Sequence, residues 1–147
     1  YSWLDRGSDE RQYCAPGIDL PIASILRSKY GKYPEYHTSL DNLKNVVTPK
    51  GLYGGYWAIR KALEAIEKNK KYIVTVLCEP QMSKRGLYYN DTLKKSNKEI
   101  KLMMDLISLC DGENSLLEIA EILKMPIWEL YKSVDELIDN KVIRAKK

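Results

Sequence analysis

Three short amphipathic segments follow one another in the last third of this 147-residue chain, and their spacing restricts the fold more than any other feature. In each segment, apolar residues recur every three or four positions, which is the period of a helix that buries one side. The segments begin near Asn97, at Ser115 and near Pro126, and residues 141–146 are typical of a closing strand. Helix, helix, turn, helix and strand in this short length predict a small winged helix.

Specific side chains mark the ends of these predicted helices. Asp111-Gly112 ends the first, which covers about residues 97–110. The second has a capping box, in which Ser115 and Glu118, three positions later, satisfy backbone N–H groups at the helix start. The residues predicted to be buried are Ile100, Met103, Met104 and Ile107 in the first helix, Leu117, Ile119, Ile122 and Leu123 in the second, and Ile127, Leu130, Tyr131, Val134, Leu137 and Ile138 in the third.

The part before the winged helix predicts a layered α/β unit. Its expected elements, in order, are a helix over 8–17 capped by Ser8 and ended by Pro16-Gly17, a buried strand over 20–27, a short helix from Thr38, a helix over 51–69 with Tyr56, Ile59, Leu63 and Ile66 on its apolar side, and a buried strand over 72–77. A polar loop from Cys78 to Lys98 has the composition of a linker. We therefore expect one domain over residues 1–91, linker included, and a winged-helix domain over 92–147.

Composition excludes several classes of protein. With 44% hydrophobic and 30% charged residues, the chain is typical of a soluble globular protein rather than a disordered one. No apolar run approaches the roughly 18–20 residues of a membrane span, so no membrane partner is expected. The three cysteines are far apart and form no CxxC pair, which excludes a cysteine-rich zinc site and favours a reducing cytoplasm. Because the chain opens with Tyr1 rather than Met, we interpret it as a piece of a longer polypeptide.

Charge argues against DNA as the partner of the winged helix. Lys and Arg contacts to phosphate supply most of the affinity of a DNA-binding helix. Residues 126–139, which would enter the groove, contain Glu129, Asp135, Glu136 and Asp139 against only Lys132. The net positive charge lies in residues 1–91, and residues 92–147 carry equal numbers of basic and acidic residues. Packing or docking to a partner is the preferred interpretation of this module, and DNA binding is the alternative.

The only histidine, His37, allows two interpretations. It could be a hydrogen-bonded, inert imidazole between Tyr36 and the start of a helix. It could instead be a zinc ligand on a loop, with Asp41 holding the ring from outside the ligand set and raising its basicity. No second histidine, HExxH or HxD pattern accompanies it, so most of the other ligands would lie outside this chain.

Two other groups of residues have a structural and a functional interpretation. Asp9 and Glu10 could simply be negative charges that the helix dipole favours in a first turn. Alternatively, they could line a functional site. The loop Glu79-Pro80-Gln81 with Lys84-Arg85-Gly86 follows a predicted strand, at the kind of sheet edge where ligands collect in α/β proteins. A solvated linker explains this loop equally well.

Three stretches, GSDERQYCAPGIDLPI, YHTSLDNL and CEPQMSKRGLY, occur in this order and resemble the C-terminal part of bacterial aminopeptidase-like zinc proteins. These are relatives of di-zinc leucyl aminopeptidases and, more distantly, of glutaminyl cyclases. The subfamily also resembles this chain in ending with a winged helix, so the resemblance covers nearly all of residues 1–147. It implies that the first domain is the C-terminal part of an aminopeptidase-like α/β domain.

The resemblance assigns roles to five residues. The histidine of YHT is the last zinc ligand of such enzymes, which implies this role for His37, and Asp41 would support it. The Asp of the S-D motif lines the active site and corresponds to Asp9. Glu10 and Tyr13 stand where better-known relatives have His and Phe, which implies a changed substrate pocket. The other ligands and the general base would precede Tyr1.

The function implied for the intact protein is zinc-dependent hydrolysis of a peptide or amide, with one or two zinc ions. The chain alone, as a fragment of a metallopeptidase, is expected to be inactive, and its first partner would be the polypeptide upstream of Tyr1. One alternative is a nucleic-acid-binding or regulatory module led by the winged helix. Another is a catalytically silent aminopeptidase fold in surface polysaccharide biosynthesis. A homo-oligomer is left open.

Overall fold

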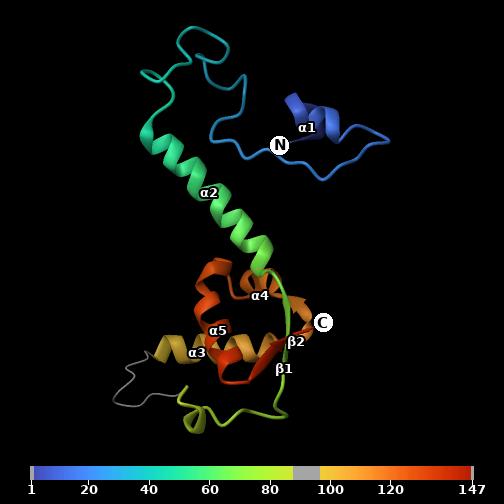
Figure 1. Ribbon diagram of the computed structural model, residues 1–147, viewed down its shortest axis with the longest axis vertical. Helices are drawn as coiled ribbons and strands as arrows, with labels where there is room; N and C mark the ends of the chain where they lie inside the picture. Colours follow the sequence, from blue (N-terminus) through green and yellow to red (C-terminus); the bar gives the residue numbers. More distant parts are fainter. Residues whose placement is uncertain (1, 88–96, 147) are drawn as a thin grey trace. The chain divides into compact units, whose positions relative to one another are not determined.

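The computed structural model describes residues 2–87 and 97–146, and Figure 1 shows the order of their helices and strands. The chain divides into two compact units, Tyr1–Arg60 and Lys61–Lys147. The boundary between them falls inside the long helix α2 (Pro49–Lys68). The mixed α/β class and the winged helix at the C-terminal end agree with the prediction.

The first unit begins with a short 3-10 turn, η1 (Trp3–Asp5), and the helix α1 (Ser8–Tyr13). The predicted helix is present, but it ends at Tyr13 rather than at Pro16-Gly17, and Ser8 does not cap it. Gly7 holds the cap position without a side-chain bond, and Ser8 has a left-handed φ of 51°. After α1, the buried Cys14 thiol donates to the carbonyl oxygens of Leu20 and Ile22 at 3.1 and 3.2 Å, which fixes the chain that follows.

Two predicted elements of this unit are absent from the described residues. Residues 20–27 form no strand, and their large apolar side chains are exposed rather than buried. The predicted helix from Thr38 is replaced by turns, because side chains compete with the helical backbone there. The Thr38 hydroxyl accepts from Leu40 N at 3.2 Å, and Asn42 Oδ1 accepts from Lys44 N at 2.9 Å.

Helix α2 confirms the predicted long helix to within two residues at each end. None of its residues is buried. The predicted apolar side is exposed, with Tyr56 at 60%, Ile59 at 48% and Ile66 at 72%. The described residues therefore do not cover this side of the helix. No helix among the residues that the structure describes is long and apolar enough to cross a membrane.

The second unit contains a three-stranded antiparallel sheet in the order β2-β1-β3. Its central strand is β1 (Lys71–Val74), which we predicted as a longer buried strand of the first α/β unit. Instead, β1 pairs with β2 (Asp111–Ser115) on one side and with β3 (Ile143–Ala145) on the other. β3 confirms the predicted closing strand. β2 was not predicted, since its sequence DGENS has no apolar alternation.

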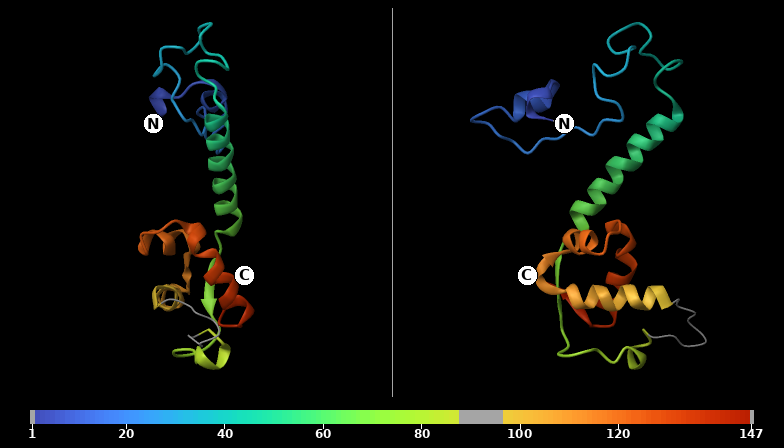
Figure 2. Two further views of the ribbon diagram at one scale, coloured as in Figure 1. Left: turned by 90° about the vertical axis from the view of Figure 1, so that its left-hand side faces the viewer. Right: turned by 180° about the vertical axis from the view of Figure 1, so that it is seen from behind.

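Three helices and a 3-10 turn lie between residues 97 and 139 of this unit, and Figure 2 shows the helices gathered beside β1. They are α3 (Asn97–Leu109), α4 (Leu116–Ile122), η3 (Ile127–Glu129) and α5 (Tyr131–Asp139). The predicted capping box is confirmed, because Ser115 N donates to Glu118 Oε2 at 2.7 Å and Glu118 N donates to Ser115 Oγ at 3.4 Å. The burial predicted for Leu117, Ile122 and Ile138 is wrong, as all three are at least 40% exposed.

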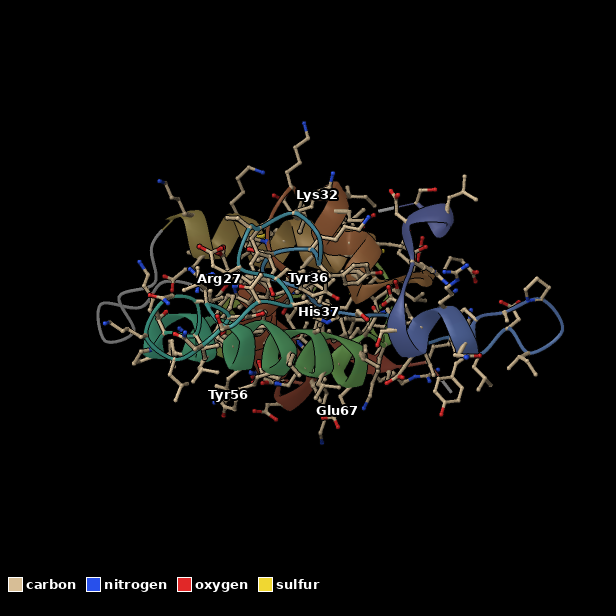
Figure 3. All side chains as sticks on the ribbon, turned by 90° about the horizontal axis from the view of Figure 1, so that it is seen from above. Arg27, Lys32, Tyr36, His37, Tyr56 and Glu67 are labelled. Atoms are coloured by element: carbon tan, nitrogen blue, oxygen red, sulfur yellow. The ribbon has the colours of Figure 1, made fainter. Side chains whose placement is uncertain are left out.

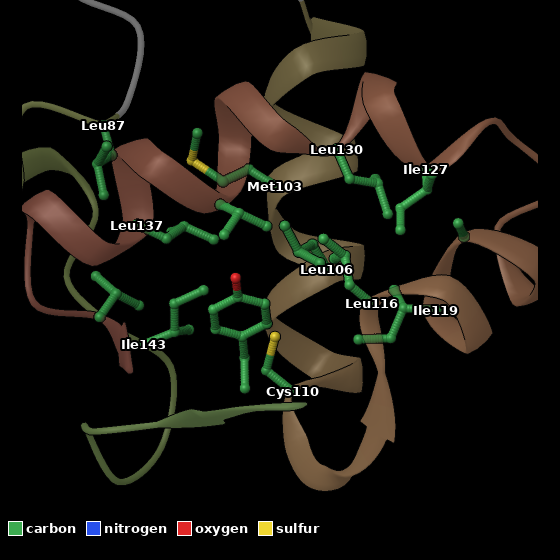
Figure 4. Close-up of a cluster of buried hydrophobic side chains, with 14 of the residues drawn as sticks. Leu87, Met103, Leu106, Cys110, Leu116, Ile119, Ile127, Leu130, Leu137 and Ile143 are labelled. Atoms are coloured by element: carbon green, nitrogen blue, oxygen red, sulfur yellow. The ribbon is translucent and has the colours of Figure 1, made fainter. Parts of the chain in front are cut away.

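The core of the second unit joins helices, sheet and one loop (Figure 4). Met103 and Leu106 of α3, Leu130 and Leu137 around α5, and Tyr72 of β1 are buried in it. Met82 and Leu87, which flank the 3-10 turn η2 (Ser83–Arg85), are 1% and 3% exposed and belong to the same cluster. The segment predicted as a linker thus contributes to this core. The predicted boundary at residues 91 and 92 lies outside the described residues.

Candidate functional site

His37 lies on the loop between α1 and α2 and is exposed to solvent. Its φ of 58° is left-handed, a conformation that a non-glycine residue seldom adopts. Its ring stacks on that of Tyr36, with centroids 4.1 Å apart and planes inclined by 14° (Figure 3). Within residues 2–87 and 97–146, no protein group makes a hydrogen bond to either ring nitrogen. The stack orients the imidazole and leaves its nitrogens available.

Three tyrosines support this loop, and we call Tyr30, Tyr33 and Tyr36 the tyrosine cluster. The ring of Tyr36 lies 6.2 Å from that of Tyr30 and 5.6 Å from that of Tyr33, the latter edge to face. Such arrangements are favoured by the quadrupoles of aromatic rings. These three residues were not predicted to belong to the site. Their regular spacing of three positions beside the only histidine is the signal that could have found them.

The tyrosine cluster connects the His37 loop to α1. Glu10 is only 3% exposed, and the Tyr30 hydroxyl donates to its Oε1 at 3.1 Å. The same hydroxyl lies 3.1 Å from the carbonyl oxygen of Asp5. A Cβ at Gly7 would lie 3.0 Å from this hydroxyl, so the glycine leaves room for the tyrosine. Glu10, predicted for a substrate pocket, is therefore a buried acceptor two aromatic rings away from His37.

Asp41 is bonded to the cluster rather than to the histidine. The Tyr33 hydroxyl donates to Asp41 Oδ2 at 3.2 Å. Desolvation and the nearby Asp41 carboxylate raise the pKa of Tyr33 above its ordinary value of 10.0. Asp41 is thus connected to His37 through the rings of Tyr33 and Tyr36, and its predicted support of the histidine stays a prediction.

The remaining predicted residues lie on α1 and face solvent. Asp9 is exposed in its first turn, and Tyr13 is 49% exposed in its last. In the described part of the chain, no hydrogen bond or ion pair joins either side chain to the His37 loop. Their predicted roles near the substrate stay predictions.

A zinc ion requires more ligands than this loop provides. Among the described residues, no group of three His, Cys, Asp or Glu side chains could hold a metal ion. His37 offers one accessible donor, whose ring is oriented by Tyr36. The described residues therefore fit one position in a zinc ligand set and do not complete the set.

The second unit presents a different candidate surface, the outer side of α5. In a helix-turn-helix protein, the second helix reads DNA with its N-terminal residues. The side of α5 that faces away from the core carries Lys132, Asp135, Glu136 and Asp139, and only one of these is basic. Such a distribution of charge disfavours contact with phosphate, and the absence of DNA binding stays a prediction.

The N-terminal end of this helix is also in contact with residues at the end of α2. Lys61 Nζ lies 5.6 Å from the ring centroid of Trp128, and Lys68 Nζ lies 4.5 Å from that of Tyr131. Ala65, between these lysines, packs against the core of the unit. Trp128 and Tyr131, at the end of the helix that would approach DNA, are thus in contact with lysines of α2.

Comparison with known proteins identifies both parts of the chain. Residues 70–145 match the model of a winged helix-turn-helix family, and residues 1–69 match that of a domain of unknown function, DUF4910. The chain belongs to this winged helix-turn-helix family.

Two relatives from Clostridium acetobutylicum extend the comparison. One is named "Putative polysaccharide biosynthesis protein with aminopeptidase-like domain" and is 40% identical over an alignment of 119 residues, and the match covers 78% of this chain and 26% of the relative. The other is a crystal structure described as a "putative peptidase", with a TM-score of 0.79 and 34% identity over 97% of this chain and 31% of the solved chain. These matches confirm that the chain is similar to aminopeptidase-like proteins and contains a winged helix, as predicted. The chain spans less than a third of either relative.

Proposed function

We propose that this chain is part of a zinc-dependent, aminopeptidase-like hydrolase and that His37 supplies one of its metal ligands. The similarity to a protein with an aminopeptidase-like domain and to a structure described as a peptidase supports the class. The observation that carries the role of His37 is its stack on Tyr36, which orients an otherwise unbonded imidazole. The other ligands for the one or two zinc ions belong to the longer, intact protein.

In this proposal, each residue of the site has a stated task. Tyr30 and Glu10 anchor the loop to α1, and Tyr36 sets the plane of the His37 ring. Asp9, exposed on α1, faces the peptide or amide substrate, and Tyr13 lines its pocket. Bound zinc would polarise the substrate carbonyl and lower the pKa of a bound water. We place the protein in the cytoplasm, because three widely spaced cysteines suit a reducing compartment better than an oxidising one.

The test measures metal in the intact protein, with and without His37. His37→Ala should lower the zinc content by at least one ion per chain and reduce hydrolysis of an aminoacyl anilide to background. Lys32→Ala, an exposed change in the same loop, is the matched control and should keep both. Zinc content that is unchanged in His37→Ala would contradict the assignment.

A catalytically silent fold that serves polysaccharide biosynthesis is the second candidate. The name of the curated relative favours it. It predicts an intact protein that contains no zinc and hydrolyses no aminoacyl substrate, so the same measurements separate the two functions.

A further inference from the structure

We propose that Arg27 binds a carboxylate group of the substrate, in a cavity that Tyr33 of the tyrosine cluster also lines. This role rests on the proposed hydrolase and names the class of its substrate, an acidic peptide or amide. Arg27 is thereby a residue that determines specificity rather than a catalytic one.

The cavity has a volume of about 430 Å³ and lies between residues 27–33 and residues 46–52. Its lining includes the cation of Arg27, the hydroxyl residues Ser28, Tyr33 and Thr48, and the apolar residues Val47 and Leu52. Among the described residues, none of those that line it is acidic. Because α2 begins at Pro49, the dipole of this helix also favours negative charge here. A cavity lined by one sign of charge favours a ligand of the opposite sign.

The guanidinium group of Arg27 is available for such a ligand. Within residues 2–87 and 97–146, its side chain makes no ion pair and no hydrogen bond. Gly51 makes room for it at the start of α2, since a Cβ there would lie 3.0 Å from Arg27 Nη1 and 3.2 Å from Thr48 Oγ1. The planar fork of N–H donors in a guanidinium matches the two oxygens of a carboxylate.

Tyr33 connects the cavity to the His37 site. Its ring lies 5.6 Å from that of Tyr36, which stacks on His37, and Figure 3 labels the latter two side chains together with Arg27. The carboxylate of Asp41 accepts from the Tyr33 hydroxyl and makes no ion pair with Arg27. A substrate whose scissile carbonyl lies at a metal bound by His37 can therefore extend its carboxylate past Tyr33 into the cavity.

A peptide can supply this carboxylate from an acidic side chain or from its C-terminus, and two pairs of substrates distinguish these sources. Glutamyl p-nitroanilide and glutaminyl p-nitroanilide differ in the side-chain group. Leucylglycine and leucylglycinamide differ in the C-terminal group. Within each pair a carboxylate replaces an amide of nearly the same shape, so contacts with the rest of the substrate cancel.

Steady-state hydrolysis by the intact protein tests the proposal. In one of the two pairs, kcat/KM should be about 10- to 100-fold higher for the acidic member, because the hydrogen bonds involve charged groups. Arg27→Gln should remove this preference without lowering the zinc content. Lys32→Gln, which removes an exposed positive charge from the same loop, is the control and should keep the preference. Equal measurable rates within both pairs, or a preference that survives Arg27→Gln, would overturn the proposal.

Binding of glutarate separates a failure of this proposal from a failure of the hydrolase. Isothermal titration uses the intact protein after removal of zinc, so that no metal binds the probe. Glutarate should bind the unmodified protein on the order of 10-fold more tightly than Arg27→Gln. Binding that depends on Arg27, in a protein that hydrolyses none of the substrates, would support the carboxylate site and count against the hydrolase. Absent binding, or equal binding by the two proteins, would overturn the site even where hydrolysis occurs.

Discussion

At the scale of single residues, Tyr30 makes the contact that connects the helix α1 to the His37 loop. Its hydroxyl donates to a carboxylate that is almost fully buried, and its ring packs near Tyr36. A buried carboxylate costs free energy unless donors compensate for the lost water. Tyr30 supplies one of these donors, and Gly7 makes room for it.

Removing this hydroxyl should weaken the site through Glu10. Tyr30→Phe should cost roughly 1–3 kcal/mol, because it removes a donor from a buried charged acceptor. Tyr33→Phe is the matched control, since its hydroxyl serves the exposed Asp41, and a smaller loss is expected. Thermal unfolding of the intact protein, followed by tyrosine circular dichroism, measures both. Equal losses in the two variants would show that burial of Glu10 does not decide the effect.

At the scale of secondary-structure elements, the start of α4 provides a pH-dependent stabilisation. The hydrogen bonds that Ser115 donates to Glu118 hold the pKa of this carboxyl below its ordinary value of 4.5. The folded state therefore binds this proton less readily than the unfolded state does. The stabilisation is complete above the unfolded pKa and is lost as the pH falls through the folded one.

A neutral side chain in place of Glu118 should make the Tm depend less on pH in the acid range. Glu118→Gln should lower the Tm at pH 6 and reduce its further decrease between about pH 5 and pH 3. Glu121→Gln, on the same helix but outside the capping box, is the control and should keep the wild-type slope. Circular dichroism melts across this range provide the measurement. An unchanged slope in Glu118→Gln would count against the capping bond as the source.

The sequence predicted elements whose determinants are local. The capping box of α4, the extent of α2 and the burial of Val134 and Leu137 in α5 each depend on residues within a few positions of one another, and all are present. Residues 20–27 were predicted as a strand from composition, but a strand also needs a neighbour, and the described chain has none there. β2 forms from a polar sequence because its backbone pairs with that of β1. In addition, Asp111 Oδ1 accepts from Glu113 N at 2.7 Å.

The candidate site was predictable only in part for a similar reason. His37 could be found because it is the only imidazole in the chain. The burial of Glu10 depends on Tyr30, twenty positions away, and Asp41 bonds Tyr33 rather than the histidine. Contacts across such distances in sequence leave no local periodicity to detect.

At the scale of the whole molecule, the charge of α5 and its contacts with α2 predict weak binding to DNA. The full chain should bind a short duplex at physiological salt with a Kd weaker than about 10⁻⁵ M, as fluorescence anisotropy can measure. Asp135→Lys combined with Asp139→Lys should tighten binding if repulsion by α5 is the cause. Asp19→Lys with Asp9→Lys makes the same change of charge in the first unit as a control. Tight binding by the unmodified chain would contradict this prediction and support nucleic-acid binding as the function.

The middle position of β1 in its sheet has a consequence for how the C-terminal module can be separated from its neighbour. The two outer strands meet only through β1, which enters directly from α2 and precedes both of them in the chain. A chain that began after β1 would leave β2 and β3 without the strand that both pair with. It would also lack Tyr72, which is part of the core. The module can therefore be inherited or expressed as a folded unit only together with β1, which the winged-helix match over residues 70–145 includes.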